Sequence, residues 1–120
     1  MIWQLDKNRG ICPQICEQLC ARIVAKEFLP GQRLMSVREV ALEAGVNPNT
    51  VQRAFEQLES QGVLRSERGS GWFVTEDMGC ARELYQTMVE QKCRQFFSDM
   101  GDLGMTPDAV KKFVEEWENE

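Results

Sequence analysis

The sequence predicts a mainly helical fold with one small β-hairpin, and three observations support this class. Apolar residues recur with helical spacing in residues 36–64, where a turn containing Gly45 separates two short helices. After Gly62 the pattern changes to two short strands around a glycine-rich turn. From residue 76 onward the helical spacing returns. This order of elements is typical of a winged helix-turn-helix domain followed by a two-helix hairpin.

Composition and charge narrow the class of protein. The chain of 120 residues is 42% hydrophobic, contains no run of about 18 apolar residues and begins without a signal-peptide pattern, so we expect a cytoplasmic protein without a membrane segment. Residues 1–75 carry nine basic and eight acidic side chains, whereas residues 76–120 carry five and eleven. A locally basic surface in the first part can therefore meet nucleic acid despite the net charge of -5.

The N-terminal third is expected to contain a short strand and a first helix. The alternating polarity of residues 2–5 favours an edge strand. Apolar residues with helical spacing then predict a helix over residues 11–28, which Pro30 and Gly31 end. These apolar residues are Ile15, Leu19, Ile23 and Val24.

The helix pair in residues 36–64 carries the strongest functional signal. Ser36 is a suitable N-cap for its first helix, and Asn47 followed by Pro48 is typical of the start of its second. One stripe of the second helix is apolar and predicts a core face: Val51, Ala54, Phe55 and Leu58. In a helix-turn-helix, the N-terminal turn of this second helix enters the DNA major groove. The pattern therefore predicts a recognition helix.

Residues 63–75 predict the hairpin, or wing. Its strands are expected at residues 63–66 and 71–75, and its turn reads ERGSG. Two glycines let the backbone approach a phosphate or enter a minor groove, and Arg68 supplies a charge at the tip. We expect residues 1–75 to form one DNA-binding domain.

Residues 76–120 predict a helical dimerisation region. A broad apolar face over residues 78–100 is followed by a capped helix start at Thr106 and Pro107. Two helices alone have little to bury against, so the same hairpin of a second chain is expected to complete the core of a homodimer. The expected interface residues are Leu84, Met88, Phe96, Phe97, Phe113 and Trp117.

These motifs carry a family resemblance. The stretch PGQRLMSVREVALEAGVNPNTVQRAFEQLESQGVLRSERGSGWFV is similar to the winged-helix domain of the GntR family of bacterial transcription regulators, and the match covers residues 11–75. The short tail resembles that of the YtrA-type subgroup, in which the tail mainly serves to dimerise the protein. The resemblance implies a sequence-specific transcription regulator, most often a repressor, that binds a two-fold-symmetric operator of double-stranded DNA.

The resemblance also implies roles for single residues. Ser36 and Arg38 correspond to the phosphate- or guanine-contacting pair of the family. Pro48 and Gln52 stand where many members have arginine, and Arg53 follows one place later, so base preference is expected to differ. The expected DNA-binding residues are Ser36, Arg38, Asn47, Pro48, Asn49, Thr50, Gln52, Arg53, Arg68, Gly69, Ser70 and Gly71.

Other function classes receive less support from the residues. With no histidine, P-loop, GxSxG motif or zinc-ligand set, the chain offers no candidate for catalysis, a cofactor or a metal site. Two alternatives stay open, a winged helix that binds another protein and a thiol-based sensor regulator. The sensor would use Cys12, Cys16 and Cys20, although cysteines in a helix more often act as small buried apolar residues. The sequence leaves room for a small-molecule effector but identifies none.

Overall fold

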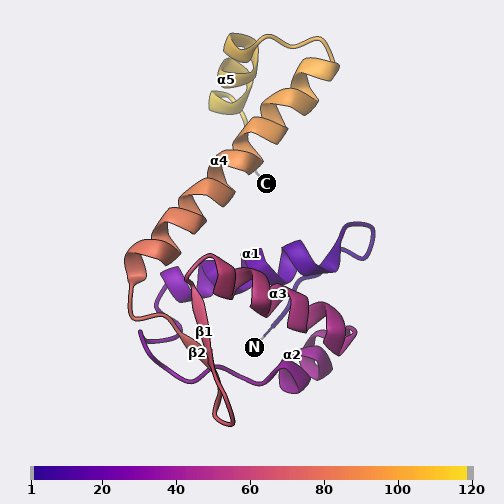
Figure 1. Cartoon of the computed structure of the whole chain (residues 1–120). Helices are drawn as coiled ribbons and strands as arrows, with labels where there is room; N and C mark the ends of the chain where they lie inside the picture. The colour runs from indigo at the N-terminus through magenta and orange to yellow at the C-terminus, as the bar shows by residue number, and fades with distance from the viewer. Residues whose placement is uncertain (1, 119–120) are drawn as a thin grey trace. The chain divides into compact units, whose positions relative to one another are not determined.

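The computed structural model describes residues 2–118, which form five helices and one two-stranded antiparallel sheet (Figure 1). The predicted fold class is therefore confirmed. The chain divides into two compact units, Met1–Gln86 and Thr87–Glu120, and the boundary falls within α4. The elements are α1 Ile11–Val24, α2 Val37–Ala44, α3 Pro48–Ser60, β1 Leu64–Glu67, β2 Gly71–Val74, α4 Met78–Asp102 and α5 Pro107–Glu115.

Helix α3 is the centre of the first unit, because it packs against α1, α2 and β1. Its predicted apolar stripe is confirmed, since all four residues are buried. The ring of Phe55 meets Trp72 of β2 edge to face, with centroids 5.4 Å apart, which anchors the hairpin to the core. Helix α1 covers the opposite side of this core with Ile15, Leu19 and Ile23, all fully buried.

The start signals of α2 and α3 are also confirmed. The Ser36 hydroxyl accepts a hydrogen bond from the Glu39 N–H, and the Glu39 carboxylate accepts one from the Ser36 N–H, so the two residues form a capping box. The side-chain oxygen of Asn47 caps α3 by accepting from the Asn49 N–H. Gly45 ends α2 with a left-handed φ of 68°, which a residue with a side chain rarely adopts.

The predicted extent of the first helix is wrong at its C-terminal end. Helix α1 stops at Val24, because Lys26 has a left-handed φ of 64° and the Glu27 N–H turns back to the carbonyl of Arg22. Such a reversal closes the helix with its own backbone groups and needs neither proline nor glycine.

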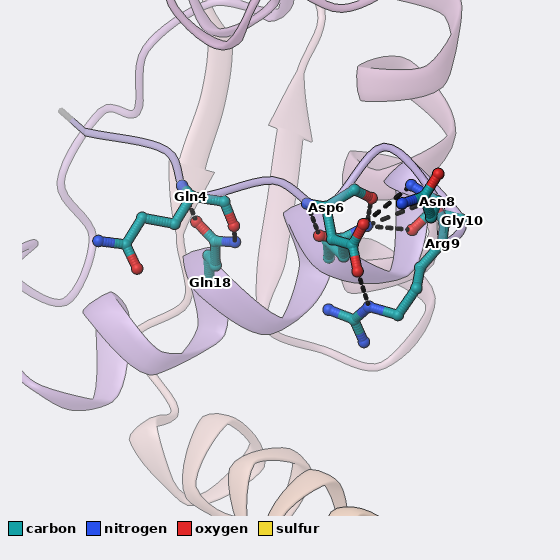
Figure 2. A network of polar contacts seen from close by, with 7 residues as sticks. Gln4, Asp6, Asn8, Arg9, Gly10 and Gln18 are labelled. Carbon is teal, nitrogen blue, oxygen red and sulfur yellow. Dashed lines mark hydrogen bonds and ion pairs between the residues drawn. The ribbon is translucent and has the colours of Figure 1, made fainter.

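The edge strand predicted for residues 2–5 is also wrong. Glutamine side chains of α1 bind the backbone of Gln4 and of the following Asp6 instead, and Figure 2 shows Gln18 at Gln4. The Gln18 amide accepts from the Gln4 N–H at 3.1 Å and donates to the Gln4 carbonyl at 2.6 Å. The buried Gln14 amide makes the same pair of bonds with Asp6, both at 2.7 Å. Side-chain amides therefore take the place of a neighbouring strand.

The free edge of the wing sheet is covered by the segment before α2. Within the sheet Ser66 lies opposite Trp72. On the outer edge of β2, the Val74 N–H donates to the Gln32 carbonyl at 2.9 Å, and Arg33 forms a single bridge with Phe73. The residues preceding α2 thus extend the wing sheet by a short third segment.

The second unit contains the rest of α4 and α5. Thr106 caps α5 by accepting from the Ala109 N–H at 3.2 Å, as predicted. Val110 is buried, whereas Trp117 lies just beyond the end of α5 and meets Phe113 edge to face at 5.6 Å. No helix within residues 2–118 is both long and apolar enough to cross a membrane.

Candidate nucleic-acid interface

The polar side of α3 is free to meet a ligand. Four of its expected contact residues are exposed, and Thr50 and Gln52 are half-buried. The exposed ones are Asn47, Pro48, Asn49 and Arg53. Since the opposite stripe of α3 is buried in the core, the fold presents the N-terminal part of this helix outward, as a recognition helix requires.

Hydrogen bonds decide which groups on α3 are available. Asn47 uses its side-chain oxygen for the helix cap, which leaves its amide donors. The Gln52 amide donates to the Glu56 carboxylate at 2.9 Å, so Gln52 is held along the helix. Within residues 2–118, the Asn49 side chain and the Arg53 guanidinium make no such bond. Asn49 and Arg53 are therefore the side chains of α3 best able to turn toward DNA.

The start of α2 adds a second polar group to this surface. Ser36 accepts a bond within the capping box, yet its hydroxyl still has one proton to donate. Arg38 is exposed one residue into the helix. A hydroxyl donor and a guanidinium at the same helix start each suit a phosphate oxygen, which accepts hydrogen bonds from both kinds of group.

The wing tip has the open backbone that its glycines suggested. Arg68, Gly69 and Ser70 are exposed, and the turn is closed by a bond from the Ser70 N–H to the Glu67 carbonyl at 2.9 Å. Gly69 has a φ of 80°, and a Cβ atom placed on it would meet nothing within 4 Å beyond its two chain neighbours, so its surroundings are open. Gly71 lies off the tip, at the start of β2 opposite Glu67.

A carboxylate that the sequence reasoning missed attaches the wing to α3. Glu59, in the last turn of α3, accepts from the Ser66 N–H at 2.9 Å and from the Ser66 hydroxyl at 2.6 Å. The Ser66 N–H is available because Trp72, its partner in β2, turns its carbonyl to Leu34 on the other edge. No local signal marks this contact, since seven residues and a change of secondary structure separate Glu59 from Ser66.

The arginines of the chain fall into two groups. Some form ion pairs with a nearby carboxylate: Arg9, Arg22, Arg65 and Arg94. Others have no carboxylate oxygen within 4.0 Å among residues 2–118: Arg33, Arg38, Arg53, Arg68 and Arg82. A free guanidinium can bind phosphate without first giving up an ion pair. All three arginines expected to contact DNA belong to the free group, although Arg82 on α4 shows that a free arginine alone is not proof of a contact.

Two of the three cysteines of α1, Cys16 and Cys20, do not support a thiol sensor. Burial, with a smaller effect of Cys12, raises the pKa of Cys16 to about 12, and burial raises the pKa of Cys20 to about 11. The thiolate is the reactive form, so both thiols stay protonated and unreactive near neutral pH. The Cys16 thiol donates instead to the Ala54 carbonyl at 3.5 Å, and within residues 2–118 no three metal-binding side chains form a group.

An outward polar recognition helix, a capped preceding helix and an open glycine-tipped wing define a winged-helix DNA-binding protein. Residues 13–74 match the family described as bacterial regulatory proteins of the gntR family. The chain therefore belongs to the GntR family, as the sequence motifs indicated.

Relatives and solved structures agree over nearly the whole chain. The uncharacterized HTH-type transcriptional regulator YhcF of Bacillus subtilis (strain 168) is 36% identical over 116 residues, which cover 93% of this chain and 96% of the relative. The HTH-type transcriptional repressor YtrA of the same organism is 31% identical over 104 residues, covering 86% of this chain and 78% of YtrA.

The structure of a GntR family transcriptional regulator from Listeria monocytogenes superposes with a TM-score of 0.80 at 32% identity, covering 95% of this chain and 100% of that one. The fold with its C-terminal helices is thus that of GntR regulators. The chain is a DNA-binding transcription regulator, and its family consists of regulators rather than enzymes.

Proposed function

We propose that this protein is a repressor that binds a two-fold-symmetric operator as a homodimer. In this proposal residues 1–75 form the DNA-binding domain and residues 76–120 the dimerisation region. The observation that carries the DNA contact is the exposed polar start of α3, together with free arginines at the start of α2 and on the wing.

Each part of this surface has a distinct role in the proposed complex. The N-terminal turn of α3 enters the major groove, where Asn49 and Arg53 reach base edges or phosphates. Ser36 and Arg38 bind the adjacent phosphates, because both groups donate hydrogen bonds from the start of α2. The open backbone at Gly69 lets the wing approach the minor groove, with Arg68 supplying positive charge.

The exposed apolar side chains of the second unit support dimerisation. Phe96, Phe113 and Trp117 are 42%, 48% and 61% exposed. Aromatic side chains gathered on one small unit favour an interface, since they gain most from leaving water. Leu84, Met88 and Phe97, which are half-buried, extend the proposed contact along α4.

The two copies would place their recognition helices in successive major grooves, about 34–36 Å apart. Repression then follows if the operator overlaps a promoter, because the bound dimer excludes the polymerase. The similarity to YtrA, which is named a repressor, supports repression rather than activation.

Fluorescence anisotropy on the DNA just upstream of the protein's own gene tests the proposal. An unrelated duplex of the same length serves as the control, and both are measured at two salt concentrations. We expect tighter binding to the upstream duplex, weakened by salt, and a sedimentation mass of two chains. In vitro transcription from the same fragment should fall as protein is added. A monomer without preference for either duplex would contradict the proposal, and a protein that bound neither at low salt would favour a protein-binding winged helix.

A further inference from the structure

The segment before α2 positions an arginine beside the wing. The Leu34 N–H donates to the Trp72 carbonyl at 2.8 Å, and Arg33 forms a bridge with Phe73. Figure 1 shows this segment passing beside the wing strands before it reaches α2. The residues on both sides of Arg33 are therefore hydrogen-bonded to β2, which places Arg33 at the edge of the wing sheet.

Arg33 is one end of a row of side chains across this sheet. Residues directly opposite each other in antiparallel segments project to the same face, so Arg33, Phe73 and Arg65 share a face. At one end of the row, Arg65 lies 5.0 Å from the centre of the Phe73 ring and forms an ion pair with Glu67. At the other end, Arg33 has no carboxylate oxygen within 4.0 Å among residues 2–118. The row thus holds one neutralised arginine and one free arginine.

The guanidinium of Arg33 lies close to Gly71. A Cβ atom placed on Gly71 would lie 3.5 Å from Nε and 3.6 Å from Nη2 of Arg33, so the guanidinium lies against bare backbone. A surface pocket of about 470 Å³ lies beside it and is lined by Arg33, Gly71, Ser36 and Glu39 among others. Glu39 is the acidic residue of this lining, and its carboxylate already accepts from the Ser36 N–H at 3.2 Å.

We propose that Arg33 binds a DNA phosphate between the α2 contact and the wing contact, an inference that rests on the proposed function. Arg33 lines one pocket with Ser36 of the α2 contact and with Gly71, the first residue of β2 after the wing turn, so its guanidinium lies between the start of α2 and the wing. The planar fork of a guanidinium suits two phosphate oxygens. Because phosphates carry no base identity, this contact adds affinity without sequence preference.

The variant Arg33→Gln tests the contact, because it removes the charge from an exposed side chain and leaves the core unchanged. Arg33→Lys keeps the charge but loses the fork. Arg65→Gln is the matched control, because Arg65 flanks the same Phe73 in the same sheet but is already ion-paired. Each variant is titrated with the upstream duplex and the unrelated duplex over a salt series, after thermal unfolding has shown an unchanged fold.

We expect R33Q to weaken binding to both duplexes by similar factors of about 3–10 per protomer. The slope of log affinity against log salt should fall by about one per protomer, or about two for a dimer. R33K should keep the wild-type slope, and R65Q should stay close to the wild type in both affinity and slope.

Three results would overturn the assignment. Unchanged affinity and slope in R33Q, with normal binding by the wild type, would remove Arg33 from the interface while the proposed function stands. An equal loss in R65Q would mean that only the total charge of the wing matters. If the wild type bound neither duplex at low salt, the proposed function itself would fail, and the role of Arg33 with it.

Discussion

The two compact units differ in how far their large apolar side chains are buried. In Met1–Gln86, α3 and α1 bury theirs in a shared core, with Phe55 fully inaccessible. In the described part of Thr87–Glu120, Val110 is the one buried residue, and Trp117 is 61% exposed. The first unit therefore has a hydrophobic core of its own, whereas the second leaves large apolar side chains exposed, which is the basis of the proposed dimer contact.

The two regions of the chain also differ in net charge. The first 75 residues are nearly neutral overall and leave several arginines unpaired at the surface, whereas residues 76–120 carry eleven acidic and five basic side chains. Free cations favour contact with phosphate, and an acidic region is repelled by it. The charge of the first region therefore agrees with the proposed DNA contact, and the acidic charge of the second agrees with the proposed protein contact.

The largest expected effect is a loss of stability caused by a substitution in the core of the first unit. Phe55→Ala removes a fully buried ring that contacts Trp72, so the free energy of unfolding should fall by about 3–5 kcal/mol. Urea denaturation followed by circular dichroism measures this loss. Leu42→Ala is the control, because Leu42 is 87% exposed and its truncation should change stability by less than about 0.5 kcal/mol. Similar losses in both variants would mean that the Phe55 core does not hold the unit together.

The second effect breaks the proposed interface and leaves each chain folded. Phe96→Asp places a charge on an exposed apolar position of α4, and we expect the dimer to weaken by about 2–4 kcal/mol, enough to give monomers at micromolar concentration. Sedimentation velocity reads the mass. Gln91→Asp adds the same charge at an exposed polar position of α4 and should leave the dimer intact. A dimer that survives in F96D would place the interface elsewhere.

The third expected effect is a loss of DNA affinity, which tests whether a free arginine of α2 contacts DNA. Arg38→Ala should reduce operator binding by about 1–3 kcal/mol without a change in the unfolding temperature. Arg82→Ala is the matched control, since Arg82 is exposed and equally unpaired but lies on α4. Anisotropy titrations of the two variants compare them directly. Equal affinities for both variants and the wild type would exclude Arg38 from the contact.

The smallest expected effect concerns the buried thiols of α1, whose ionisation should not change the stability of the fold at neutral pH. Folding raises the pKa of Cys16 to about 12 and that of Cys20 to about 11, from an ordinary value of 9.0. A group whose pKa is raised in the folded state stabilises the fold fully below its unfolded pKa. That stability is lost as the pH rises from about 9 toward 12, because the unfolded state releases the protons first.

An aromatic disulfide reagent at pH 8 checks the same thiols chemically. The exposed Cys93 should react rapidly, whereas Cys16 and Cys20 should react only when the protein unfolds. Rapid reaction of all five thiols in the native protein would revive the sensor hypothesis.

Local signals in the sequence predicted most of the secondary structure. The caps at Ser36, Asn47 and Thr106 and the stripe of α3 each depend on residues a few positions apart, so a helix carries its own evidence. The N-terminal segment could not be read this way. Its alternating polarity resembles a strand, but the groups that bind its backbone are the side chains of Gln14 and Gln18 on α1.

The features of the candidate site likewise fall into those that local sequence predicted and those that it could not. The helix-turn-helix pattern and the glycine-rich turn were enough to place the recognition helix and the wing, because capping, periodicity and backbone freedom are local properties. Only the tertiary structure decided that Glu59 holds the wing at Ser66, that Arg33 lies over Gly71, and which arginines are ion-paired. These features depend on distances between segments that are remote in sequence, and such distances exist only once the core has packed.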